Sequence, residues 1–251
     1  MARRKLIAGN WKMNLSRTEA NALAQAIASQ NAPMVEVALF PPAIWLTDVA
    51  AAVNGMPIRI GAQNCWNAQK GAFTGELSPA MIAEVATLVL IGHSERRLIL
   101  GESDELIRTK IDAALAAGLG VVLCVGETLE TRQAGNAETH VSAQIHAALD
   151  RRPPEELAQI TIAYEPVWAI GTGVAATPAD AQEMSASIRR EVASIDSGYA
   201  ERVRILYGGS VNPGNAAELL IQPDVDGALV GGASLVAADF ESIIAAATAT
   251  V

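Results

Sequence analysis

An eight-stranded parallel β/α barrel, (β/α)8, is the fold class that the sequence predicts. Short apolar runs rich in β-branched residues recur along the chain, and segments with helix-entry signals lie between them. Such alternation is typical of a parallel sheet covered by helices, and eight units in 251 residues favour closure into a barrel. The expected strands are residues 6–8, 35–40, 58–60, 88–91, 121–125, 160–163, 203–206 and 227–230.

Helix starts are marked by capping residues and prolines. Ser16 and Glu19 have the spacing of a capping box, and a proline at the first helical turn is expected at Ser78-Pro79, Thr177-Pro178 and Asn212-Pro213. No linker, low-complexity run or block of charge interrupts the series. We therefore expect one domain over residues 1–251, although two small domains would also suit the length.

An open doubly wound sheet is the alternative fold. It would favour a G-x-G-x-x-G sequence after the first strand, and Gly9-Asn10-Trp11-Lys12 does not have that pattern.

Composition limits the classes of partner. The formal charge of -9 would repel a nucleic-acid backbone, whereas one lysine and a few backbone N–H groups could still bind a small anion. The longest nearly uncharged stretch, 113–126, is too short to span a membrane and contains Gly118 and Gly120. We expect neither nucleic acid nor membrane as a partner.

The cysteines and histidines give no sign of a disulfide or a metal. Cys65 and Cys124 belong to no C-x-x-C pair, and the three histidines have no metal-binding spacing. The basic residues 3–5 precede an apolar run too short for a signal peptide, so this run reads as the first strand. These features predict two reduced thiols, a cytoplasmic location and no metal.

In a barrel of this kind, catalytic groups lie where the strands end and the βα loops begin. This rule gives a short set of candidates, which are Asn10 and Lys12 after the first strand, His93 after the fourth, Glu165 after the sixth, Gly208-Gly209-Ser210 after the seventh, and Gly231-Gly232 after the eighth.

Glu165 and His93 are suited to proton transfer. Glu165 stands at a strand end before Pro166, where burial would make it a stronger base; it could instead only accept hydrogen bonds from a loop. His93 precedes Ser94, which looks like the start of a helix. A helix N-terminus disfavours imidazolium, so we expect a neutral ring that donates a hydrogen bond.

Lys12 admits two roles, because an ammonium at the pocket floor could stabilise an oxyanion or form a Schiff base. The carboxylate and imidazole nearby favour the electrostatic role. Glu95 is a candidate partner of Lys12, and the alternative is a surface carboxylate beside Arg96.

The glycine pairs after the seventh and eighth strands predict a phosphate cup, although each pair alone could be a tight turn. Residues 169–173 follow Pro166-Val167-Trp168 and contain small residues around Ile170. They predict a lid, with an ordinary βα loop as the alternative.

Three motifs give the chain a family resemblance. They stand in the order found in triosephosphate isomerases, and they are Gly9-Asn10-Trp11-Lys12-Met13-Asn14, residues 91–97 and residues 163–173. The likeness runs from Lys5 to about Ala245. The resemblance implies a TIM barrel that interconverts dihydroxyacetone phosphate and D-glyceraldehyde 3-phosphate through an enediolate, in glycolysis and gluconeogenesis. It implies no cofactor.

The resemblance also implies roles for residues of the site. Glu165 would move a proton between adjacent carbons and His93 between the two oxygens, while Asn10 and Lys12 stabilise the enediolate. Cys124, placed after the fifth strand, would support Glu165 by packing. The residues implied to bind the phosphate are Gly171, Ser210, Gly231 and Gly232.

A lid is implied over the site. Tyr207 and Ser210 would hold it closed near Ala176 and Gly173, and Glu127 would contact its hinge when it is open. The implied lid comprises Pro166, Val167, Trp168, Ala169, Ile170, Gly171, Thr172, Gly173, Val174, Ala175 and Ala176.

A homodimer is implied by the loop at residues 63–76, whose Thr74 would reach into the partner's active site. Glu76 and Arg96 would pair across the interface.

Two other functions stay open, a Schiff-base aldolase that uses Lys12 and a binding scaffold without catalysis.

Overall fold

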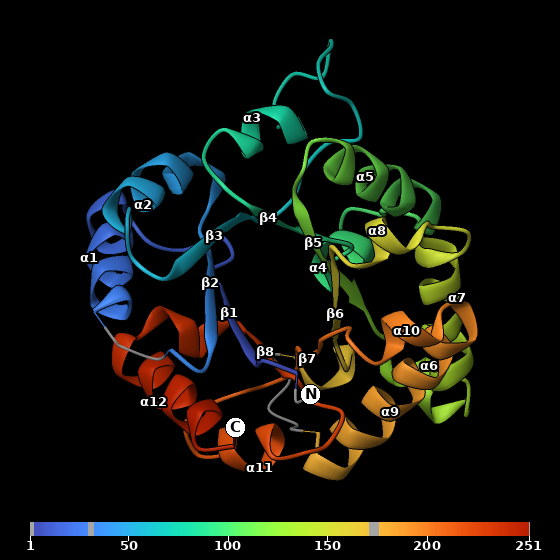
Figure 1. Ribbon diagram of the computed structural model, residues 1–251. Helices are drawn as coiled ribbons and strands as arrows, with labels where there is room; N and C mark the ends of the chain where they lie inside the picture. The colour runs from blue at the N-terminus through green and yellow to red at the C-terminus, as the bar shows by residue number, and fades with distance from the viewer. Residues whose placement is uncertain (1–2, 30–32, 171–175, 251) are drawn as a thin grey trace.

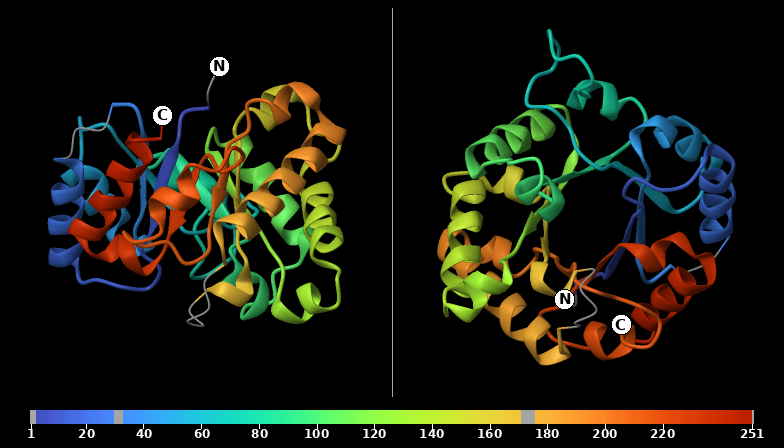
Figure 2. Two further views of the ribbon diagram at one scale, coloured as in Figure 1. Left: turned by 90° about the horizontal axis from the view of Figure 1, so that it is seen from below. Right: turned by 180° about the vertical axis from the view of Figure 1, so that it is seen from behind.

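The computed structural model describes residues 3–29, 33–170 and 176–250. Its eight strands are all parallel and form a closed barrel in the order β1 to β8. Figure 1 shows the helices as a ring around the strands, and the side view in Figure 2 shows the same two layers. The predicted barrel is confirmed.

The elements follow one another around the barrel. The strands are β1 (Leu6–Asn10), β2 (Glu36–Phe40), β3 (Ile58–Ala62), β4 (Leu88–Ile91), β5 (Gly120–Val125), β6 (Ile160–Tyr164), β7 (Ile205–Tyr207) and β8 (Gly227–Val230). The α-helices are α1 (Arg17–Ala28), α2 (Leu46–Ala52), α3 (Pro79–Ala83), α4 (Ser94–Leu98), α5 (Asp104–Ala116), α6 (Leu129–Gln133), α7 (Ala137–Leu149), α8 (Pro154–Leu157), α9 (Pro178–Ile195), α10 (Ser197–Ala200), α11 (Ala216–Leu220) and α12 (Ala237–Thr248). Short 3-10 helices are η1 (Ala43–Trp45), η2 (Val167–Ala169) and η3 (Gly232–Leu235).

Most of the predicted helix starts are confirmed. Ser16 and Glu19 form the capping box of α1, and Pro79 and Pro178 open α3 and α9.

The predicted start at Asn212-Pro213 is wrong, because α11 begins only at Ala216. The Asn212 side chain accepts a hydrogen bond from the Gly214 N–H at 2.8 Å, and the Asn215 side chain accepts one from the Asn212 N–H at 2.9 Å. These local bonds stabilise a turn in place of the first helical turn.

The strands bury both faces, because successive side chains of a strand point in opposite directions. One set packs against the helices, and the other fills the inside of the barrel. A Cβ on Gly61 would overlap the ring of Phe40, so the missing side chain makes room for this ring inside the barrel. The inner set consists of Leu6, Ala8, Ala38, Phe40, Leu88, Leu90, Val122, Cys124, Ala163, Leu206 and Leu229.

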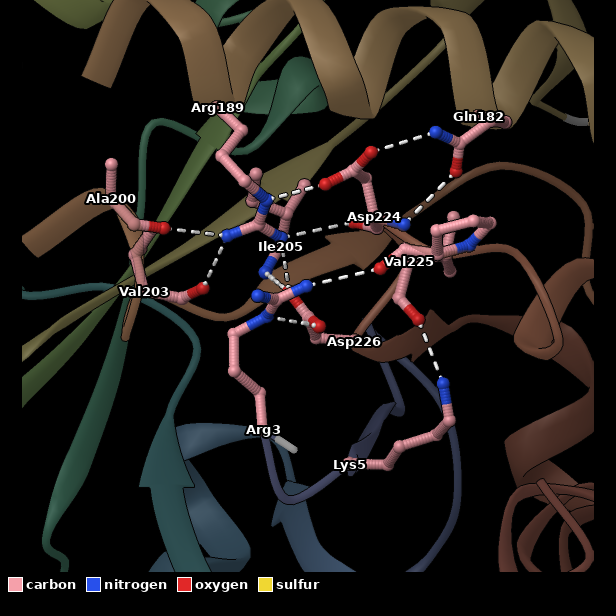
Figure 3. Close-up of polar contacts among 11 residues, drawn as sticks. Arg3, Lys5, Gln182, Arg189, Ala200, Val203, Ile205, Asp224, Val225 and Asp226 are labelled. Atoms are coloured by element: carbon pink, nitrogen blue, oxygen red, sulfur yellow. Dashed lines mark hydrogen bonds and ion pairs between the residues drawn. The ribbon is translucent and has the colours of Figure 1, made fainter. Parts of the chain in front are cut away.

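A charged network joins the ends at which β1, β7 and β8 begin (Figure 3). The Arg189 guanidinium of α9 lies 2.6 Å from both Asp224 and Asp226, and Arg3 binds the other oxygen of Asp226 at 2.7 Å. Asp226 also accepts the Ile205 N–H at 2.9 Å. Charge-assisted bonds of this kind hold the N-terminal segment, α9 and the loop before β8 together.

His146 bridges α7 and α9. Its Nδ1 lies 2.8 Å from Asp150 and its Nε2 lies 3.3 Å from Glu191, which also accepts the Ser142 hydroxyl. The hydrogen bond with Asp150 is the largest cause of a raised pKa for His146. Burial is the next largest cause and lowers this pKa, while the hydrogen bond with Glu191 raises it. A pKa raised in the folded state stabilises the protein at low pH and loses this effect as pH rises through the folded pKa.

We therefore predict that His146→Gln costs stability mainly at acidic pH. Below the ordinary histidine pKa of about 6.5, the free energy of unfolding of the parent should exceed that of the variant by a few tenths of a kcal/mol. The difference is small because His146 and its acidic partners are partly exposed, and solvent screens their charges. The difference should shrink at pH 8.5. Urea unfolding at pH 5.5 and 8.5 measures it, with Asp150→Asn/Glu191→Gln as the background in which it should vanish; an equal difference at both pH values would contradict the prediction.

Candidate active site

A pocket of about 450 Å³ lies at the carboxyl ends of the strands. It collects side chains and backbone from segments that are far apart in the sequence. Its lining includes the predicted residues Asn10, Lys12, His93, Glu165, Ile170, Ser210, Gly231 and Gly232, together with Gly208, Gly209, Val211, Asn212, Leu229, Ala233 and Asp239.

Glu165 directly follows β6 and is 2% exposed. Its Oε2 accepts the Ser94 N–H at 2.8 Å, and its Oε1 lies 3.2 Å from the Ser94 hydroxyl and 3.1 Å from His93 Nε2. The first turn of α4 thus supplies three donors to one buried carboxylate. Ser94 was not predicted as a site residue, and its place directly after His93 is the signal that could have identified it.

His93 caps α4 and fixes its own tautomer. Its Nδ1 accepts the Glu95 N–H at 3.3 Å, which leaves Nε2 to carry the proton of a neutral ring. The protonated Nε2 faces Glu165 and the pocket. This arrangement fits the neutral donor expected at a helix N-terminus.

Lys12 has a left-handed backbone, with φ of 51°, which is uncommon for a residue with a side chain. Asn10 accepts its N–H at 3.0 Å, and the Gln63 amide donates to its carbonyl at 2.8 Å. Its ammonium binds Glu95 at 2.6 Å. Strain of this kind persists where the surroundings hold the residue from several sides. Gln63 was not predicted as a site residue, because no local motif marks a contact between residues so far apart in the sequence.

The far side of the pocket offers backbone N–H groups. Ser210 follows β7, Gly231 follows β8, and η3 begins at Gly232. The first N–H groups of a helix have no acceptor within it, so they are free to bind an anion. The predicted phosphate residues that the structure describes therefore share one wall with Lys12, whose Cε would lie 3.5 Å from a Cβ on Gly231.

The first hinge of the predicted lid is held by Glu127, which is completely buried. The Glu127 carboxylate accepts the Trp168 indole N–H at 2.9 Å and the Tyr164 hydroxyl at 3.0 Å, and its carbonyl accepts the Val167 N–H at 3.1 Å. Ile170 lines the pocket, and Ala176 is buried. Of the other predicted lid residues, Gly171, Thr172, Gly173, Val174 and Ala175 lie outside the described residues.

The Tyr207 hydroxyl is buried, and among the described residues it has no hydrogen-bond partner. Burial raises its pKa, so it remains a phenol that can donate.

Cys124 lies inside the barrel and within β5, as the expected strand 121–125 has it, so the expectation that Cys124 follows this strand is wrong. The strand simply continues to Val125, because its backbone still pairs with β6 there. Burial raises the pKa of the Cys124 thiol, and the nearby charge of Glu165 raises it further. Burial also raises the pKa of Cys65 to about 12. Both are unpaired thiols, and neither forms the reactive thiolate at neutral pH.

The three predicted interface residues lie at the rim of the barrel. Thr74 and Glu76 are exposed in the loop between β3 and α3, which extends beyond the ring of helices in Figure 1. Arg96 binds Glu102 of the same chain at 2.6 Å. A second hollow of about 720 Å³ adjoins the site, and Lys12, Glu95, Met13, Ile99 and Leu100 are among its lining residues.

The described residues contain no group of three or more histidine, cysteine or acidic side chains placed to hold a metal ion. Within residues 3–29, 33–170 and 176–250, no helix has the length and apolar character needed to cross a membrane.

Comparisons with known proteins agree with this geometry. The family model described as triosephosphate isomerase matches residues 5–247. A triosephosphate isomerase of Rhodopirellula baltica is 50% identical over 251 residues, which cover 98% of this chain and 99% of the relative. One of Chloroflexus aurantiacus is 51% identical, with 95% and 97% covered, and one of Pseudomonas entomophila is 48% identical, with 98% and 99% covered. The chain therefore belongs to the triosephosphate isomerase family.

Proposed function

We propose that Glu165, His93, Lys12 and Asn10 carry out the reaction of this family, the interconversion of dihydroxyacetone phosphate and D-glyceraldehyde 3-phosphate. The observation that supports these roles is a base and an acid in contact, since Glu165 Oε1 lies 3.1 Å from His93 Nε2 in a pocket that Lys12 also lines. General acid–base catalysis needs such groups within hydrogen-bond reach of the same substrate.

The proton transfers follow from this arrangement. Glu165 takes a proton from the carbon next to the carbonyl, and the electron pair moves to the carbonyl oxygen. The His93 N–H and the Lys12 ammonium stabilise the resulting enediolate. His93 Nε2 has one proton, which now points at Glu165. The substrate oxygen must therefore replace the carboxylate as its acceptor, and the freed Glu165 turns to the substrate carbon.

We place the phosphate at the wall formed by Ser210, Gly231 and Gly232, with Gly171 joining it from the lid. Residues 166–176 would act as that lid, and its hinge bond between Trp168 and Glu127 supports the proposal. Tyr207 and Ser210 would supply bonds that the closed lid needs. Excluding water prevents loss of phosphate from the enediolate.

Two alternatives are less well supported. A Schiff-base aldolase needs the Lys12 amine free to attack, whereas its Nζ binds Glu95 at 2.6 Å. A non-catalytic scaffold gives no reason for a buried carboxylate to face an imidazole N–H.

Glu165→Gln should lower kcat by about 10²- to 10⁴-fold or more, because it removes the general base. KM should change little, since the amide keeps the size of the side chain. A coupled assay with glyceraldehyde 3-phosphate and EDTA measures both constants. Glu105→Gln, which changes an exposed carboxylate of α5, is the control and should match the parent. Turnover of Glu165→Gln within tenfold of the parent would refute the assignment.

We further propose a homodimer, in which the loop that carries Thr74 enters the hollow beside the partner's site. Large apolar side chains around this hollow support it, because such side chains seldom remain exposed together on a monomer. Met13 is 95% exposed, Ile99 76% and Leu100 61%. Glu76 and Arg96 would then pair between subunits.

We also propose a cytoplasmic location. The two buried thiols are consistent with its reducing environment.

Thr74→Arg should split the dimer and lower activity at the same time, because a bulky charge would have to enter the partner's hollow. Sedimentation velocity and the coupled assay, at the same protein concentration, test this. Thr139→Arg adds the same charge at an exposed position on α7 and should leave mass and activity unchanged. A sedimentation coefficient for Thr74→Arg equal to that of the parent would argue against the interface.

A further inference from the structure

Gln144 binds both main-chain groups of a single distant residue. It lies on α7 with 6% of its surface exposed. Its Oε1 accepts the Gly126 N–H at 2.8 Å, and its Nε2 donates to the Gly126 carbonyl at 3.2 Å. The second hydrogen of Nε2 faces His140 Nε2 at 3.1 Å, so every polar group of the side chain has a partner. A buried amide with both ends satisfied has one orientation and holds its partner firmly.

Gly126 is the middle residue of a segment that lies along the proposed base. On one side of it, the Val125 carbonyl accepts the Glu165 N–H at 2.7 Å. On the other side, the Glu127 carbonyl accepts the Val167 N–H at 3.1 Å. A Cβ on Gly126 would overlap the carbonyl of Glu165, so the two backbones are in direct contact.

The need for Gln144 follows from how parallel strands pair. Alternate residues of a strand direct their N–H and C=O groups to opposite neighbours. Residues 125 and 127 bond to the segment after β6, so the groups of Gly126 point the other way. There β4 has already ended at Ile91, opposite Leu123. Among the described residues, no strand therefore reaches Gly126 on that side, and the Gln144 side chain supplies the hydrogen bonds that a strand would.

We propose that Gln144 is a positioning residue for Glu165 and for the hinge at Trp168. It acts through the backbone of Gly126. This backbone fixes the position of the Glu165 main chain and the position of Glu127 against the hinge. The inference rests on the proposed role of Glu165 as the base. Gln144 does not touch the pocket, and it was not predicted from the sequence, because a glutamine within an amphipathic helix resembles an ordinary surface residue.

Gln182 provides a matched control. It is also a glutamine on a helix of the outer ring, and its amide likewise donates one hydrogen bond to a distant residue and accepts one from it. Its Nε2 donates to the Asp224 carboxylate at 2.7 Å, and its Oε1 accepts the Asp224 N–H at 3.0 Å (Figure 3). Asp224 precedes β8, so this contact lies at the end of the barrel opposite to the site.

The test compares Gln144→Met with Gln182→Met, since methionine keeps the volume of glutamine and removes both hydrogen bonds. Both variants should melt at a lower temperature than the parent. At a temperature where circular dichroism shows each to be folded, Gln144→Met should lose about 10- to 100-fold in kcat with KM within about threefold, because small displacements of a catalytic group are costly. Gln182→Met should keep the kcat of the parent.

A kcat of Gln144→Met within twofold of that of Gln182→Met would overturn the inference and leave Gln144 a purely structural residue. If the methionine variant does not fold, Gln144→Asn keeps a polar amide but is one methylene too short to reach both groups, and it should show the same loss of kcat. Glu165→Gln, assayed in parallel, separates the two claims. If it is inactive while Gln144→Met is fully active, only the positioning role fails; if it is active, the base assignment itself fails.

Discussion

The closure of eight parallel strands into one ring is the constraint on which the rest of the molecule depends. Because every strand runs in the same direction, all carboxyl ends open on one face, and the loops that follow them converge there. Residues as distant in sequence as Lys12, His93 and Glu165 then line one pocket. The inner layer of small and aliphatic side chains fixes the width of the ring and hence the distances across that pocket.

The two ends of the barrel use polar groups differently. At the end where the strands begin, the Arg189 guanidinium is paired with the carboxylates of both Asp224 and Asp226. At the other end, Glu165 accepts hydrogen bonds from donors that a substrate could also use, and Lys12 keeps a strained backbone. Fixed charges hold the scaffold, while the site contains groups whose partners can be exchanged during a reaction. This division separates stability from chemistry within one chain.

Local patterns were enough to predict much of this structure. Continuous apolar runs located all eight strands, and the strand-end rule placed Glu165, His93 and Lys12 at one pocket. The errors came from competing local bonds, as at Asn212, where a side-chain turn displaces the first turn of α11. Gln63 and Gln144 could not be assigned roles, because each acts through a partner that only the closed barrel brings near. Ser94 was missed although it directly follows His93, and its contact with Glu165 also depends on the closed barrel.

In the proposed reaction, a carboxylate removes a proton from one substrate carbon and returns a proton to the adjacent carbon, with an enediolate between the two steps. The most direct measurement is isomerisation of glyceraldehyde 3-phosphate in D₂O, followed by NMR of the dihydroxyacetone phosphate formed. A carboxylic acid exchanges its proton with solvent, so we expect deuterium at the carbon that gains the proton, in at least part of the product. Product without any deuterium would contradict proton transfer through Glu165 and would indicate a direct shift of hydride between the carbons.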